Sequence, residues 1–132
     1  MKKLLIALLV LFVFGCATTP VTVQQLEQKT GSSVLSEQEI KDRFVGKDLT
    51  GVFAESNNLC KLHFYEDGKA KGSSAKTDSK GTWKITKTET GLPVLVMNWT
   101  SSWGTEKGTL IEKNGRIDLV SQSGMAVYKD IK

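Results

Sequence analysis

Apolar and polar residues alternate with a period of two through most of the chain after residue 48, and this pattern limits the fold more than any other feature. In the clearest example, Cys60, Leu62 and Phe64 alternate with Lys61 and His63. Successive side chains of a β-strand point to opposite faces, so the alternation predicts strands with one buried face. The expected strands cover residues 49–54, 59–66, 69–75, 81–88, 94–100, 105–113, 116–122 and 125–130.

Short turns of the hairpin type separate these strands. Asp67-Gly68 and Asn114-Gly115 are the strongest turn dipeptides, and each favours a tight connection between antiparallel neighbours. About eight strands joined in this way predict an all-β fold, an antiparallel meander closed into a small barrel without exposed edges. Such a barrel is filled by side chains or holds one small ligand, and we expect a filled interior. The side chains expected to point inward are Cys60, Leu62, Phe64, Trp83, Ile85, Leu95, Met97 and Trp99, together with Leu119 or Val120 and Val127.

One short helix is expected before the first of these strands. Ser36 and Glu39 form an S-x-x-E capping box, the signature of a helix N-terminus. Ile40 and Phe44 follow on one face of that helix, four residues apart. The pattern predicts a helix over residues 37–45 that plugs or flanks one end of the barrel, within a domain covering residues 35–132.

The N-terminal residues have the proportions of a secretion signal. Two lysines precede an unbroken apolar run from Leu4 to Phe14. This run is about 11 residues long, well short of the roughly 20 residues that span a bilayer as a helix. The residues Gly15-Cys16 that follow resemble the lipobox of bacterial lipoprotein precursors, in which a small residue precedes an obligatory cysteine. An ordinary signal peptide with a chance cysteine, or an uncleaved anchor, remains as an alternative.

The lipobox resemblance implies a membrane anchor. In that family the cysteine thiol is acylated and the chain is then cut before it, which makes residues 1–15 a signal peptide and Cys16 the lipid attachment site. Two or three acyl chains anchor a protein stably, whereas one chain binds only marginally. Ala17 after the cysteine implies the outer membrane, facing the periplasm, if the cell is Gram-negative. The polar residues 16–34 are expected to form the lipidated N-terminus and a flexible tether.

Charge and cysteine content narrow the functions further. The chain has 18 basic and 14 acidic residues, and two of the basic residues lie in the expected signal peptide, which leaves a net charge of about +2. The basic residues are scattered, whereas a nucleic-acid interface needs a clustered basic face, so no nucleic-acid partner is expected. With Cys16 lipidated, Cys60 has no intrachain partner and is either buried or free to pair between molecules. Its position in the alternating pattern favours burial.

Catalytic and metal-binding patterns are not found in the sequence, and neither an enzyme nor a cofactor is expected. The single histidine, His63, lies on the strand face opposite to Cys60, so the two cannot form a nucleophile–base pair. A metal site needs clustered ligands, and Asp67, Asp78 and Asp118 lie in separate turns and strands. We therefore expect a non-enzymatic protein without a metal.

Two further resemblances concern the barrel. Phe64-Tyr65-x-Asp67-Gly68, followed by Gly81-Thr82-Trp83, resembles small bacterial lipocalin-like proteins, many of which have no known function. Gly-x-Trp lies on the first strand of lipocalins proper, whereas Trp83 falls on about the fourth expected strand.

The other resemblance is to the membrane-bound inhibitors of c-type lysozyme, which carry a Ser-Gly-x-x-Tyr loop. Here the segment from Ser123 to Tyr128 is one residue longer. Their Trp-x-Lys-Gly motif has its nearest counterpart in residues 103–108, upstream of that loop rather than downstream and two residues too long.

Exposed aromatic residues are the best candidates for a binding surface. Trp99 and Trp103 flank a turn, where they could stack on a ligand or partner, and Ser123 and Tyr128 are the other candidate contacts. The alternative is that Trp83 and Trp99 belong to the core and Trp103 caps the barrel. The expected function is a non-enzymatic binding or interaction module in the cell envelope. Its partner would be an envelope protein or a small apolar ligand, and inhibition of a lysozyme-like enzyme and carriage of an apolar ligand inside the barrel remain as alternatives.

Overall fold

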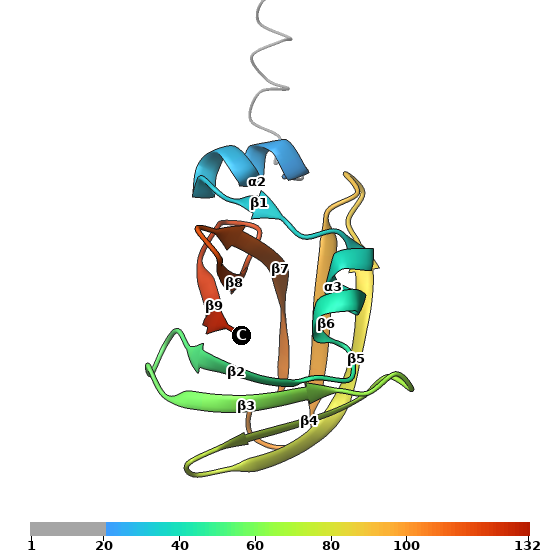
Figure 1. Cartoon of the computed structure of the whole chain (residues 1–132), viewed down its shortest axis with the longest axis vertical. Coiled ribbons are helices and arrows are strands. Elements are labelled where there is room, and N and C mark those ends of the chain that lie inside the picture. The colour runs from blue at the N-terminus through green and yellow to red at the C-terminus, as the bar shows by residue number, and fades with distance from the viewer. Residues whose placement is uncertain (1–20) are drawn as a thin grey trace, which may run out of the picture.

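A computed structural model describes residues 21–132, and eight of its strands form a closed antiparallel barrel (Figure 1). Each strand from β2 to β8 pairs with the next, and β9 pairs back to β2. The prediction of an eight-stranded all-β meander is therefore confirmed. The barrel strands are β2 (Asp48–Phe53), β3 (Leu59–Phe64), β4 (Lys69–Ser74), β5 (Asp78–Lys87), β6 (Pro93–Trp99), β7 (Thr105–Lys113), β8 (Arg116–Val120) and β9 (Ala126–Ile131). The expected signal peptide, Cys16 and the first tether residues lie outside the described residues.

The tight turns lie where their dipeptides predict them. Asn114 and Gly115 join β7 to β8 with φ angles of 53° and 79°, the left-handed pair that a type I′ turn requires. Gly68 has a φ of 87° in the turn between β3 and β4. These two hairpins set the register, so that Lys113 faces Arg116 and Phe64 faces Ala70.

The barrel interior contains almost all of the residues expected there. One cluster joins Cys60, Leu62, Phe64, Leu95, Met97, Trp99 and Leu119, with Trp83 and Ile85 partly buried against it. Of the two alternatives on β8, Leu119 points inward, while Val120 belongs to a second cluster on the outside of the barrel. On β9 the fully buried side chain is Tyr128 and not Val127, which is only partly buried. Register shifts between β8 and β9 accompany this difference from strict alternation.

The expected short helix is α3 (Glu37–Phe44), and it packs against one end of the barrel. Its capping box is present, since the Ser36 hydroxyl accepts a hydrogen bond from the Glu39 amide and the Glu39 carboxylate accepts one from the Ser36 amide. Ile40 and Phe44 are buried in the same cluster as the barrel interior. Arg43 of this helix makes a bidentate ion pair with Glu112 of β7 at 2.7 and 3.2 Å, which fixes the helix to the barrel wall.

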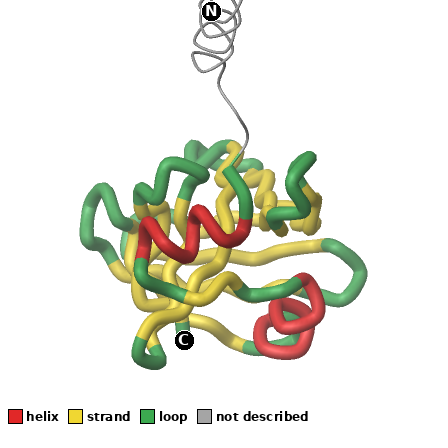
Figure 2. The backbone as a smooth tube through the Cα atoms, turned by 90° about the horizontal axis from the view of Figure 1, so that it is seen from above, coloured by secondary structure: helices red, strands yellow, loops and turns green. Residues whose placement is uncertain are grey.

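Residues 21–34 differ from the sequence expectation, which placed them in a flexible tether. They form helix α2 (Val23–Thr30) and strand β1 (Ser33–Val34), which pairs with β7. The helix begins at a second capping box, because Thr22 and Gln25 exchange side-chain and backbone hydrogen bonds. Residues 21–34 therefore belong to the folded domain, which has two short helices among its described residues instead of one. Figure 2 shows these helices at separate places on the outside of the strands.

The contact that holds α2 is apolar. Leu26 has no exposed surface and forms a second cluster with Leu92, Ile111 and Val120, on the outer face of the barrel. Ile111 and Val120 point outward because their neighbours Leu110 and Leu119 point inward. This patch on the barrel wall is thus covered by the helix.

The two ends of the barrel differ. At the closed end, Phe44 and the core side chains leave an internal cavity of about 10 Å³, enough for at most one water molecule. The expectation of a filled interior is confirmed for this part of the barrel. The turns β2–β3, β4–β5, β6–β7 and β8–β9 gather at the opposite end, which we call the mouth. In residues 21–132 we find no helix long and apolar enough to cross a membrane.

Candidate ligand-binding pocket

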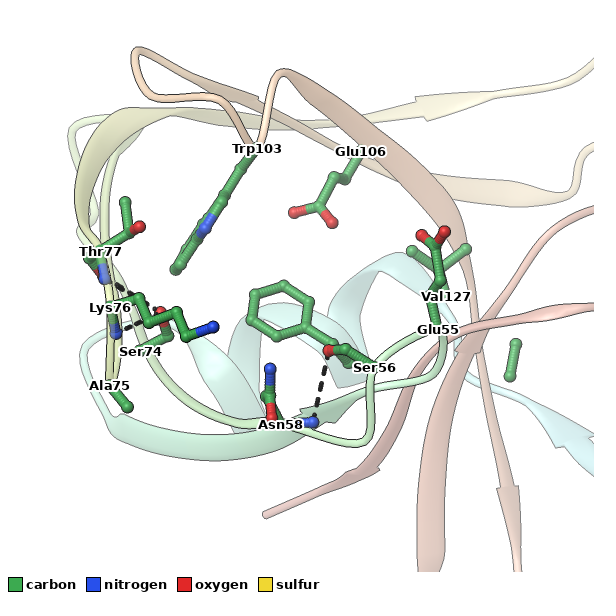
Figure 3. A pocket seen from close by; sticks show the side chains of 12 residues that line it. Glu55, Ser56, Asn58, Ser74, Ala75, Lys76, Thr77, Trp103, Glu106 and Val127 are labelled. Atoms are coloured by element: carbon green, nitrogen blue, oxygen red, sulfur yellow. Dashed lines mark hydrogen bonds between the residues drawn. The ribbon is translucent and has the colours of Figure 1, made fainter.

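A pocket of about 520 Å³ opens at the mouth (Figure 3). This volume lies within the range of roughly 300–1,000 Å³ typical of small-molecule sites. Three connections of the barrel, β2–β3, β4–β5 and β6–β7, contribute to it together with the ends of neighbouring strands, so residues far apart in the sequence meet here. The lining residues are Phe53, Glu55, Ser56, Asn58, Ser74, Ala75, Lys76, Thr77, Trp103, Glu106, Ala126 and Val127.

The rim of the pocket is polar, and the floor combines aromatic rings with one carboxylate. Glu55, Asn58 and Lys76 are exposed on the rim, whereas Trp103 and Glu106 are partly buried. Figure 3 shows the carboxylate of Glu106 and the ring of Trp103 turned into the pocket. Polar groups placed around a partly apolar concave surface are the usual arrangement of a ligand site, where they orient the ligand.

Glu106 is held by two neutral donors on one of its oxygens. Its Oε1 accepts a hydrogen bond from the Trp99 indole N–H at 2.8 Å and another from the Tyr128 hydroxyl. Its Oε2 accepts no hydrogen bond from the residues that the structure describes. The carboxylate is therefore fixed in orientation, with one oxygen free to meet a group in the pocket.

Aromatic rings surround this carboxylate. The Trp103 ring contacts Phe53 and Trp99 edge to face, with ring centroids 5.1 and 5.2 Å apart, and Phe53 lies 5.1 Å from Tyr128. Gly72 of β4 makes room for this arrangement, because a Cβ at this position would lie 2.5 Å from the Trp103 ring. The glycine thus lets the indole lie against the inner wall of the mouth.

Burial changes the acidity of the groups at the floor. Desolvation raises the pKa of Glu106 above its ordinary 4.5, although the hydrogen bonds from Tyr128 and Trp99 act in the opposite direction. Burial, and then the hydrogen bond to Glu106, raises the pKa of the Tyr128 phenol far above its usual 10. Tyr128 therefore stays protonated at neutral pH and remains the donor of this pair.

The four candidate contacts expected from the sequence have different places. Trp103 lines the pocket, and Trp99 and Tyr128 lie behind Glu106, where they are 7 % and 0 % exposed. These two act on a ligand only through the carboxylate that they orient. Ser123 lies apart, in the exposed β8–β9 turn, where its hydroxyl is 2.8 Å from that of Ser121. The structure thus joins three of the four candidates into one site.

Glu106 and Phe53 were not expected from the sequence, although a signal for each was present. Glu106 is two and four residues before Gly108 and Leu110, so strict alternation from the buried Leu110 places it on the inner face. Phe53 is four residues after the buried Leu49 and shares its face in the same way. A charged residue at an inward position is costly in a core, which makes Glu106 a candidate functional residue.

Other candidate groups lie outside the pocket. His63 is on the outer face, with its Nδ1 atom 2.8 Å from Asp48, while Cys60 points into the core. The two therefore point to opposite sides of the sheet, as expected. Residues 21–132 hold no group of three or more His, Cys, Asp or Glu side chains placed to ligate a metal ion.

Cys60 is expected to be unreactive in the folded protein. Its side chain is 2 % exposed, and burial, with the charge of Glu106 as a smaller cause, raises the pKa of the thiol to about 12. Because the thiolate is the reactive form, iodoacetamide at pH 8 should modify Cys60 only after unfolding. Mass spectrometry of alkylation with and without denaturant measures this. Labelling of the native protein at the rate of a small thiol would contradict the buried position.

Comparison with known proteins does not connect the chain to a relative. Neither the protein-family models, nor the curated proteins, nor the solved structures compared with it give a match. The functional conclusion therefore depends on the pocket and on the N-terminal residues themselves.

Proposed function

We propose that this chain is a lipid-anchored protein of the bacterial cell envelope that binds a small ligand in the mouth pocket without catalysing a reaction. The observation that carries the binding function is the pocket of about 520 Å³, with an oriented carboxylate and aromatic rings at its floor. Because the core beneath leaves only about 10 Å³, a ligand of the barrel would lie in the mouth and not in the interior.

The anchor is proposed from the lipobox-like residues that end at Cys16, with the outer membrane as its place in a Gram-negative cell. The position of Val21 supports a binding role for such an anchored protein. Its carbonyl oxygen accepts a hydrogen bond of 2.6 Å from Thr90, in the β5–β6 turn at the closed end. A lipid on Cys16 would be no more than about 17 Å of extended chain from this point. The mouth would then face away from the membrane, open to ligands.

A binding role without catalysis is supported by the hydroxyl groups of the pocket. The Ser74 hydroxyl accepts hydrogen bonds from the amides of Lys76 and Thr77, and the Ser56 hydroxyl accepts one from the Asn58 amide. These serines stabilise the turns of the rim, and within residues 21–132 neither is hydrogen-bonded to a general base. The pocket thus offers recognition groups in place of an activated nucleophile.

Intact-mass spectrometry of the detergent-extracted protein tests the anchor. A mature chain that starts at an acylated Cys16 is the expected result, and a Cys16→Ser variant should remain unprocessed and carry no acyl mass. A wild-type chain without acyl mass would reject the anchor and leave the pocket unaffected.

Ligand release from the same preparation, together with an NMR fragment screen, tests the binding function. Bound molecules should shift the indole signals of Trp99 and Trp103. A Trp103→Ala variant should no longer bind these molecules, so its Trp99 signal should not shift. Tyr65→Ala is the matched control, since Tyr65 is an exposed aromatic residue next to the β3–β4 turn, away from the mouth. A folded protein in which no released molecule and no fragment perturbs the mouth would overturn the proposal.

A further inference from the structure

The carboxylate at the floor of the mouth pocket has no positively charged partner in the part of the chain that the structure describes. No Lys, Arg or His nitrogen of the described residues lies within 4.0 Å of Glu106. An unpaired carboxylate in apolar surroundings is unfavourable unless a counter-ion compensates it. The free Oε2 atom is where a cation from outside the chain would make contact.

The rings around Glu106 favour the same kind of ligand. The faces of aromatic rings carry negative electrostatic potential, and a cation within about 6 Å of a ring centroid is attracted to it. Phe53 and Trp103 line the pocket directly, and the centroids of their rings are 5.1 Å apart. A positive group that enters the pocket would therefore meet two ring surfaces as well as the carboxylate.

The floor of the pocket offers few free hydrogen-bond acceptors, and this favours a methylated ammonium group over a primary ammonium group. A primary ammonium group has three N–H donors, and each needs an acceptor once water is displaced. One oxygen of Glu106 is already used by Trp99 and Tyr128, and the nearest walls are aromatic. A methylated ammonium group has few or no N–H donors, and its methyl groups pack well against rings.

The charges around the mouth are compatible with a cation. The ionisable lining residues are Glu55, Lys76 and Glu106, which together carry one net negative charge when Glu106 is ionised. Lys76 is exposed on the rim and makes no ion pair within 4.0 Å in the described part of the chain. The Lys76 amine therefore does not neutralise the Glu106 carboxylate, which is available to a cationic ligand.

We propose that the mouth pocket binds a methylated ammonium ion, whose positive group lies beside Glu106 and against the rings of Phe53 and Trp103. This inference rests on the proposed binding function and assigns a chemical class to its ligand. The remainder of the ligand lies toward the polar rim, where Asn58 and Thr77 offer hydrogen-bonding groups.

Choline and its uncharged analogue 3,3-dimethylbutan-1-ol, in which carbon replaces nitrogen, test the charge at constant shape. Binding to the mature chain in maltoside micelles is followed by the indole N–H signals of Trp99 and Trp103. Choline should shift these signals, and the neutral analogue should bind at least about tenfold more weakly. Ethanolamine, a primary amine, should also bind more weakly than choline.

Two variants assign the effect to one carboxylate. Glu106→Gln keeps the shape of the side chain and should weaken choline binding at least about tenfold. Glu66→Gln removes the same charge from an exposed position beside the β3–β4 turn, and should leave binding unchanged. The affinity of the wild type for choline should rise with pH as Glu106 ionises, whereas the affinity of the Glu106→Gln variant should show no such rise. The other ionisable groups that face Glu106 or line the pocket are Tyr128, Cys60, Glu55 and Lys76.

The outcomes separate this inference from the proposed function. If choline and its neutral analogue bind at the mouth equally well, the pocket is a ligand site but the preference for a cation is wrong. If neither binds while other fragments perturb Trp103, the ligand class is wrong and the binding function stands. If no molecule perturbs the mouth of the folded protein, both proposals fail.

Discussion

Replacing Leu26 with alanine is expected to lower the free energy of unfolding by about 2–5 kcal/mol, the range seen for fully buried leucines. Leu26 has no exposed surface and is the buried residue of α2, where it contacts Leu92, Ile111 and Val120. The substitution removes this contact and exposes apolar surface of the barrel wall. Chemical denaturation of both proteins measures the difference.

A variant on the same helix provides the control. Gln28 is exposed, so Gln28→Ala should change the free energy of unfolding by no more than about 0.5 kcal/mol. Equal stabilities of the Leu26→Ala and Gln28→Ala variants would mean that α2 contributes nothing to the fold. Residues 21–34 would then behave as the flexible tether that their composition indicates.

Two substitutions of Glu106 are expected to change stability in opposite directions. Glu106→Gln should raise the free energy of unfolding at neutral pH, by on the order of 1 kcal/mol, because it removes a partly buried charge and keeps an acceptor for Tyr128 and Trp99. Glu106→Ala should lower it by roughly 1–3 kcal/mol, because it leaves those two buried donors without an acceptor. The pair separates the charge of the side chain from its hydrogen bonding.

The pH dependence of stability provides a second measurement on the same carboxylate. Burial raises the pKa of Glu106 above its ordinary 4.5, so the folded state binds this proton more tightly than the unfolded state does. The stability that the proton contributes is fully present below about pH 4.5 and is lost as pH rises through the raised pKa. The difference between Glu106→Gln and the wild type should therefore grow from acid to neutral pH. A difference that is constant with pH would mean that the charge of Glu106 carries no cost in the fold.

A gain in stability together with a loss of binding would mark Glu106 as a functional residue. Ligand sites commonly retain groups that are unfavourable in the folded protein without ligand, because the same groups recognise the ligand. The proposed cation would compensate the charge of Glu106 in the complex. The Glu106→Gln variant should therefore resist denaturation better than the wild type and bind choline less well.

The barrel could be predicted because its signals are local. Alternation of side chains fixes which face of a strand is buried, and dipeptides such as Asn114-Gly115 fix where the chain reverses. The capping box at Ser36 predicts α3 in the same way, and the helix is found at Glu37–Phe44. These signals act over two to four residues, so they can be recognised in the sequence alone.

Helix α2 could have been recognised from a similar local signal. Thr22 and Gln25 form the same type of capping box as Ser36 and Glu39, and Gly31 ends the helix with a φ of 66°. A single leucine in a run of polar residues, however, gives too weak an apolar pattern to predict a packed helix. The helix is stable because Leu26 meets a patch of the barrel wall that is built from three distant segments.

The mouth pocket could not have been derived from the sequence, although each of its residues has a predictable face. The sequence by itself determined the strands, the tight turns, the helix at Ser36 and the burial of Cys60, since these depend on neighbours close in the chain. Only the tertiary structure decided that Phe53, Trp103 and Glu106 meet at one end of the barrel, with Tyr128 and Trp99 behind them. The physical reason is closure of the barrel, because the pairing of β9 with β2 brings residues more than 70 positions apart against one another.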